Sequence, residues 1–224
     1  MIVTKKAPNE NGRAFALRTL RENIIETKLK PGDVLSEKAL ADEMGLSRTP
    51  VREALIQLST LQIVEILPQR GSKIALIDMN IVEEASFFRM IMEIAVAKLA
   101  CKLANEDDYH ELENILKLQD FYIQSAAFDQ LLKSDDQFHQ YLFKIANKMK
   151  CYEMVTNMSI HFDRVRRLAL SAVTDLKIVE DHWHIYHAIR NHDEKVVETQ
   201  IINHLNRYHI DEASIRQTYP SYFK

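Results

Sequence analysis

Four residues able to bind a metal ion interrupt apolar stripes of helical period in the second half of the chain. They are Asp135, His139, His182 and His204. Asp135 and His139 lie one turn apart on one predicted helix, and each of the other two histidines interrupts the core face of a separate helix. A carboxylate and three imidazoles suit a divalent ion such as Zn, Ni, Mn or Fe. The same groups could instead satisfy one another as a buried hydrogen-bonded cluster, so the pattern alone leaves both interpretations open.

The remaining histidines fall at the edges or on the polar faces of the predicted helices. We expect these six side chains to be solvated rather than to bind a ligand: His110, His161, His184, His187, His192 and His209. The two cysteines, Cys101 and Cys151, lack metal-like spacing and are expected to be reduced thiols.

A second group of chemically active residues stands at the start of a predicted helix in the first half of the chain. Ser47 is a suitable N-cap, and the apolar stripe from Val51 to Leu58 must be buried. Arg48 and Thr49 lie at the N-terminal end of this helix, where free N–H groups and the helix dipole favour a phosphate, and Arg52 follows one turn later. The helix start is therefore suited to contact nucleic acid.

The elements around this helix complete a DNA-binding motif. A helix over residues 13–26 backs a shorter helix over 37–44, which Ser36 caps and Gly45 ends two residues before Ser47. Helix, tight glycine turn and helix make a helix-turn-helix.

Two β-branched runs follow, over residues 63–67 and 73–77, and the segment 68–72 between them is rich in turn residues. They predict a hairpin, or wing, that carries Arg70 and Lys73. The expected DNA-contacting residues are Lys38, Ser47, Arg48, Thr49, Arg52, Arg70, Gly71 and Lys73.

The rest of the chain is expected to be helical, because no proline occurs between residue 69 and Pro220 and no segment alternates convincingly as a strand. Six helices are predicted, at 80–103, 106–126, 128–147, 150–171, 176–191 and 193–217. The fold class is therefore mainly α: an N-terminal winged helix-turn-helix in residues 1–78, and a C-terminal antiparallel bundle of about six helices in residues 79–224.

The first half resembles the winged helix of the GntR family of bacterial transcription regulators. The resemblance covers residues 13–77 and is carried by Pro31-Gly32-Asp33-Val34-Leu35, Leu40-Ala41, the run from Gly45 to Leu55, and Arg70-Gly71. Thr27 and Gln62 depart from it, because glycines are usual there at the ends of two helices. Those turns are expected either to be rebuilt or to cost up to about 1 kcal/mol each.

Residues 80–217 resemble the all-helical ligand-binding (FCD) domain of the FadR-like branch of the same family. Its metal-binding members carry Asp-x3-His on one helix and two further histidines, and all four positions are filled here. The resemblance also implies a role for Arg89 and Glu93, which match an Arg/Glu pair on the first helix of that domain. Arg89 either pairs with Glu93 or receives an effector carboxylate.

Charge is divided unevenly along the chain. The net charge is -3, but residues 1–78 carry twelve Lys and Arg against ten Asp and Glu, whereas the remainder carries seventeen against twenty-two. DNA binding must therefore rest on a few placed cations, doubled by dimerisation, rather than on a generally basic surface. Residues 1–12 have no apolar signal region and no later segment is long and apolar enough for a membrane span, so a cytoplasmic location is expected.

The favoured function is a homodimeric transcription regulator that binds a palindromic operator and responds to a small carboxylate effector, such as an organic or sugar acid, near a divalent metal ion. The alternative is a metal-dependent enzyme with an appended winged helix, although four protein ligands leave little room for catalysis and no general base is evident. A winged helix used only for protein contact does not explain why Arg48, Arg52, Arg70 and Lys73 all lie at the expected DNA edge. The effector, the metal, the operator and the sign of regulation are not encoded in these patterns.

Overall fold

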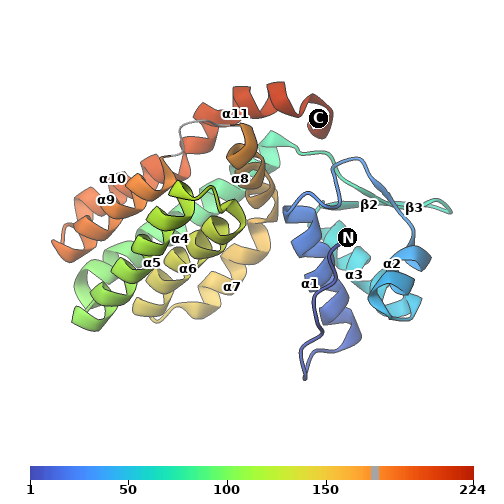
Figure 1. The fold of residues 1–224 in the computed structure, drawn as a ribbon, viewed down its shortest axis with the longest axis horizontal. Coiled ribbons are helices and arrows are strands. Elements are labelled where there is room, and N and C mark those ends of the chain that lie inside the picture. The colour runs from blue at the N-terminus through green and yellow to red at the C-terminus, as the bar shows by residue number, and fades with distance from the viewer. Residues whose placement is uncertain (173–176) are drawn as a thin grey trace. The chain divides into compact units, whose positions relative to one another are not determined.

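The computed structural model describes residues 1–172 and 177–224 (Figure 1). In the first half of the chain its elements are α1 (Gly12–Ile25), β1 (Val34–Leu35), α2 (Glu37–Met44), α3 (Arg48–Thr60), β2 (Val64–Leu67) and β3 (Gly71–Ile74). The second half contains α4 (Met79–Leu103), α5 (Glu106–Gln124), α6 (Phe128–Ile145), α7 (Met149–Met158), α8 (Ile160–Ala172), α9 (Ile178–Arg190), α10 (Glu194–Leu205), α11 (Arg207–Thr218) and a short 3-10 helix (Pro220–Tyr222). The predicted mainly α fold with an N-terminal winged helix-turn-helix is confirmed.

The chain forms two compact units. The winged-helix unit contains residues 1–82 together with 160–167 and 216–224, and the helical unit contains 83–159 and 168–215. Two segments of the second half therefore pack with the first half, which no pattern in the sequence had indicated. Among the described residues, no helix is both long enough and apolar enough to cross a membrane.

The helix-turn-helix forms as its sequence signals predict. Ser36 Oγ accepts a hydrogen bond from the backbone N–H of Ala39 at the start of α2, and Gly45 ends that helix at a φ of 64°. The third helix begins directly after Ser47, but the side chain of Ser47 makes no capping hydrogen bond, so its expected capping role is not seen. The apolar stripe of α3 is buried as predicted.

The two turns that lack the usual glycine keep the left-handed conformation. Thr27 has a φ of 53° and Gln62 a φ of 56°. A residue with a Cβ is strained in this region, by about 1 kcal/mol relative to glycine. The turns are therefore not rebuilt, and the strain is carried by the surrounding fold.

The second strand of the wing differs from its prediction in its bounds. The second strand of the hairpin runs from Gly71 to Ile74, not from 73 to 77, because it pairs with both β2 and a strand that was not predicted, β1. Gly71 has a φ of 94°, and a Cβ placed on it would lie 2.5 Å from the carbonyl oxygen of Leu35. Only glycine fits where the backbones of the paired strands β1 and β3 approach so closely.

Two of the predicted helices are each broken into two. The segment 150–171 divides into α7 and α8 at Ser159, whose hydroxyl donates to the carbonyl of Val155 at 2.8 Å, a local bond that competes with the regular helix. The segment 193–217 divides at Asn206 into α10 and α11, with no proline or glycine to mark the break. The expected start of another helix at residue 176 lies outside the described residues.

Candidate metal centre and nucleic-acid interface

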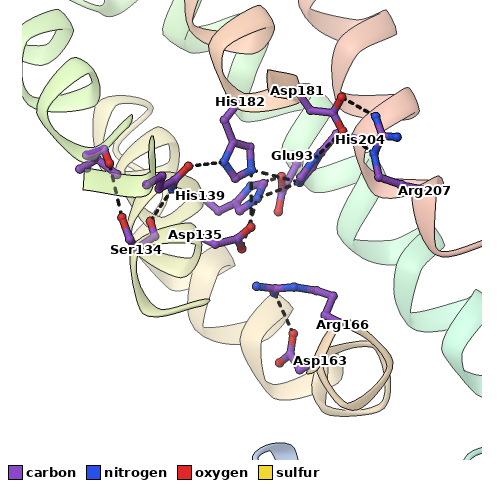
Figure 2. Close-up of polar contacts among 12 residues, drawn as sticks. Glu93, Ser134, Asp135, His139, Asp163, Arg166, Asp181, His182, His204 and Arg207 are labelled. Carbon is purple, nitrogen blue, oxygen red and sulfur yellow. Dashed lines mark hydrogen bonds and ion pairs between the residues drawn. The ribbon is translucent and has the colours of Figure 1, made fainter. Parts of the chain in front are cut away.

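The structure brings together the four residues that interrupt the apolar stripes. Asp135 and His139 lie on α6, His182 on α9 and His204 on α10, and their side chains converge (Figure 2). One ligand atom from each residue lies within 4.8 Å of the ligand atoms of the other three. Asp135, His139 and His182 are buried, so the cluster is enclosed by the helical unit.

The three imidazoles point the same ring nitrogen at one another. His204 Nε2 lies 3.2 Å from His182 Nε2 and 3.2 Å from His139 Nε2. Asp135 faces the same point, with its carboxylate oxygens 3.6 Å from His182 Nε2 and 3.8 Å from His139 Nε2. One small volume thus receives three nitrogens and a carboxylate.

A buried ion pair orients the ring of His139. Its Nδ1 lies 2.6 Å from Oε2 of Glu93, whose Oε1 accepts a hydrogen bond from Arg89 Nε, also at 2.6 Å. Burial alone raises the pKa of Glu93, but the charge of Arg89 and the contact with His139 outweigh it and hold that pKa at about 2. Burial lowers the pKa of His139, so its imidazole is neutral at neutral pH.

A carboxamide orients the ring of His182. The Nε2 of Gln119 donates to the carbonyl of Ser134 at 2.9 Å, which turns its Oε1 toward His182 Nδ1 at 2.8 Å. This oxygen can only accept, so Nδ1 of His182 carries the hydrogen.

A second ion pair lies behind His204. Its Nδ1 is 3.5 Å from Oδ2 of Asp181 (Figure 2). Arg207 donates two hydrogen bonds to the same carboxylate, from Nε at 2.7 Å and from Nη2 at 2.5 Å. Burial raises the pKa of Asp181, but hydrogen bonds from His204 and Arg207 lower it overall, so the carboxylate is ionised.

These three anchors determine what the cluster can do. Each Nδ1 faces an acceptor oxygen, so each Nε2 presents a lone pair to the shared centre. Three lone pairs and a carboxylate held this close repel one another unless a cation lies among them. The donor set and its outer contacts therefore fit a divalent metal ion, with the carboxylate or amide partners behind the ligands that metal sites commonly have.

The outer contacts were only partly visible in the sequence. Gln119 interrupts an apolar stripe of α5 and is fully buried, a signal of the kind that predicted the four candidate ligands. Arg207 carried no signal, because it follows an unpredicted break between helices. Arg89, expected either to pair with Glu93 or to receive an effector, is buried and makes that pair.

The expected DNA-contacting residues lie on the winged-helix unit. Four cations from α2, α3 and the hairpin line one hollow of about 570 Å³, which Gly71 also lines: Lys38, Arg48, Arg52 and Arg70. Ser47 and Thr49 are exposed at the start of α3, and Lys73 is half-buried on β3, but none of the three lines the hollow.

One of the histidines expected to be solvated is buried instead. His161 is 3% exposed, and its Nε2 lies 2.8 Å from the carbonyl oxygen of Leu61. The expectation failed because the start of α8 packs within the winged-helix unit, a long-range arrangement that helical periodicity cannot reveal.

Comparison with known proteins gives consistent results. Residues 14–74 match the model described as "Bacterial regulatory proteins, gntR family", and residues 84–207 match the FCD domain. The chain is 32% identical over 223 residues to the HTH-type transcriptional repressor RspR of Escherichia coli K12, with 99% of this chain and 98% of that protein covered. It is 26% identical over 195 residues to the Nta operon transcriptional regulator of Aminobacter aminovorans, covering 84% and 88%. The structure of E. coli McbR/YncC superposes with a TM-score of 0.78 at 19% identity, covering 94% of this chain and 99% of that one, which supports the fold.

Proposed function

Since the chain belongs to the gntR family of bacterial transcription regulators and carries an FCD domain, we propose that it reads a palindromic operator as a homodimer and responds to a small carboxylate effector at a divalent metal ion. It is a regulator rather than an enzyme. We further propose that it acts in the cytoplasm, where a bacterial chromosome lies.

GntR regulators bind DNA through the helix-turn-helix, and we assign base and phosphate contacts in this chain to α3 and the wing. Arg48 and Arg52 are exposed on α3, and Arg70 lies on the wing beside the same hollow. Arginine pairs with guanine edges in the major groove and with phosphates on either side of it. Ser47, Thr49, Lys38, Gly71 and Lys73 complete the proposed DNA surface.

Dimerisation is proposed because one winged helix carries few cations for a specific DNA complex. A twofold arrangement doubles the phosphate contacts and matches a palindrome. Light scattering at micromolar concentration should give twice the mass of 26.1 kDa. A monomer that binds an isolated half-site as tightly as the full palindrome would remove this part of the proposal.

The metal rests on a single observation, the convergence of three Nε2 lone pairs and Asp135 on one buried point. His139, His182, His204 and Asp135 would hold the ion, and Zn, Ni, Mn and Fe(II) all accept such ligands. When bound, the ion would supply a fixed positive charge that ties three helices together and attracts an anionic effector.

The effector is assigned to the class of small organic or sugar acids. A carboxylate complements both a metal ion and a nearby guanidinium, and Arg89 is the candidate, acting together with its partner Glu93. Residues 1–78 would carry DNA binding, and 79–224 would carry the metal, the effector and the dimer contact.

The proposal is tested by elemental analysis combined with native mass spectrometry of gently purified protein. The expected result is one divalent ion for each chain, and a retained small acid that is lost when the metal is removed. Protein that contains no stoichiometric metal, and takes up none of Zn, Ni or Mn when they are added, would show that the cluster is only a hydrogen-bonded polar core.

A further inference from the structure

The first half of α8 belongs to the winged-helix unit although it follows the DNA-binding sequence by some eighty residues. Ile160 is 2% exposed and is part of the same hydrophobic cluster as the buried faces of α1 and α3. The second half of α8 belongs to the helical unit, where Leu170 packs in a cluster with Leu131 and Val179. Residues 160–167 of α8 therefore belong to the core of the winged-helix unit.

His161 on this helix holds the C-terminal end of α3. The carbonyl oxygen of Leu61, the residue that caps α3, can only accept, so the Nε2 of His161 donates to it across 2.8 Å. Carbonyls at the end of a helix have no partner within the helix, and burial makes an unpaired one costly. His161 therefore fixes the end of the helix whose other end carries Arg48.

Arg164, one turn further along, holds the base of the wing. Its Nη2 donates to the carbonyl of Ala75 at 2.6 Å, and Ala75 itself donates to the carbonyl of Ile63 at the start of the hairpin. The side chain is fully buried, and its Nε and Nη1 have no hydrogen-bond partner among the described residues. Burial lowers the pKa of this guanidinium to about 10, so it is still protonated at neutral pH.

A third contact joins the same segment to α1. Arg167 Nη2 lies 3.0 Å from Oε2 of Glu26, the residue that caps the end of α1. The segment 160–167 thus contacts the ends of three elements of the DNA-binding motif.

We propose that His161 and Arg164 are positioning residues for DNA binding, which hold the recognition helix α3 and the wing at the relative placement needed to reach one DNA site. The inference rests on the proposed assignment of α3 and the wing as the DNA-contacting elements. It implies that the DNA-binding surface is completed by residues from the second half of the chain. A change in α8 would therefore alter operator affinity without touching any DNA contact.

The decisive variant is Arg164→Met in the full chain. Methionine fills a similar space and removes a buried charge whose Nε and Nη1 have no hydrogen-bond partner among the described residues, but it leaves the carbonyl of Ala75 without its donor. Because these two effects on the free energy of unfolding oppose each other, the melting temperature should stay close to that of the wild type. Affinity should fall about fivefold to tenfold for a duplex selected by the wild-type protein from random-sequence DNA. Affinity for non-selected duplex should be unchanged, because the phosphate contacts remain.

His161 offers a matched pair of variants. Phenylalanine at this position (His161→Phe) leaves Leu61 O unpaired and should lower the ratio of selected to non-selected affinity by a similar factor. Glutamine (His161→Gln) keeps an N–H donor and should restore most of that ratio. Hydrogen exchange over residues 59–64 and 72–76 should be faster in Arg164→Met and His161→Phe than in the wild type.

Two controls separate this inference from the proposed function. Ser171→Ala, at an exposed position of the same helix, should leave the ratio unchanged. Wild-type binding by Arg52→Ala would show that the assignment of α3 is wrong. If Arg52→Ala loses binding but Arg164→Met and His161→Phe keep both the wild-type ratio and the wild-type exchange rates, the positioning role is overturned.

Discussion

The candidate metal centre and the proposed DNA surface are built in opposite ways. In the candidate metal centre every imidazole faces a second side chain at its Nδ1, and the clustered side chains are shielded from water. On the DNA surface Arg48, Arg52 and Arg70 are exposed around an open hollow. The difference teaches that the helical unit fixes its cluster by contacts within the chain, whereas the winged-helix unit leaves the side chains of the proposed DNA surface exposed. Their scaffold, by contrast, is held by α8.

The strongest way to break this comparison is to remove the metal. A chelator should lower the melting temperature by about 5 to 10 °C, because a ligand at a hundred times its Kd stabilises a protein by about 2.7 kcal/mol. His204→Ala should lower it similarly and should not respond further to the chelator. Calorimetry with and without added Zn, Ni or Mn measures the effect.

In the same experiment, binding to DNA at low salt should largely survive, since the DNA-contacting residues lie in the other compact unit. A melting temperature that is indifferent to both chelator and metal would contradict the preorganised centre.

The outer contacts of the centre can be tested separately. Gln119→Leu removes the oxygen that fixes the ring of His182, and should weaken metal binding about 10- to 100-fold while leaving the four ligands in place. Gln119→Glu keeps an acceptor and should retain more of the affinity. Competition with a chromophoric chelator measures both, and equal affinities in Gln119→Leu and wild type would show that the outer contacts do not orient the ligands.

On the proposed DNA surface, the substitution of a single side chain is expected to weaken operator binding. Arg48→Ala and Arg52→Ala should each cost about 1 to 3 kcal/mol of operator binding if they read base edges, with no change in melting temperature. Lys28→Ala removes an equal charge from an exposed position outside the hollow and serves as the control. Gel shifts at a stated salt concentration would contradict the assignment if both arginine variants bind as tightly as the control.

The smallest expected effect is a pH dependence that tests the scaffold of the DNA surface. Burial, together with the charge of Arg164, lowers the pKa of His161 despite its bond to Leu61 and the nearby Asp78. A histidine whose pKa is depressed on folding binds its proton more readily in the unfolded chain. The stability it contributes is therefore present above its ordinary pKa of about 6.5 and is lost as the pH falls below that value.

The free energy of unfolding of the wild type should accordingly fall more steeply between pH 7 and 5.5 than that of His161→Gln, which has no titrating ring. Urea unfolding at a series of pH values measures the difference. The other groups near this ring, Asp78, Arg164 and Lys224, are the same in both proteins, so parallel curves would show that His161 is not buried in solution.

The sequence alone determined the local signals and which four residues are the candidate ligands. Ser36, Gly45 and the apolar stripe of α3 specified the helix-turn-helix, because caps and periodicity act within a few residues. The four polar interruptions on core faces predicted the Asp135, His139, His182 and His204 cluster, because a helix brings residues three and four apart onto one side. Only the tertiary structure decided which nitrogen each histidine presents, since Gln119, Glu93 and Asp181 reach the rings from distant parts of the chain.

The same limit explains what periodicity missed. The third strand of the sheet, the breaks at Ser159 and Asn206, and the burial of His161 all depend on long-range packing. A single helical pattern can continue across a break, because the residues on either side are still good helix formers and only their neighbours in space differ. The placement of Arg164 under the wing is decided by such packing, because its carbonyl partner lies 89 residues away along the chain.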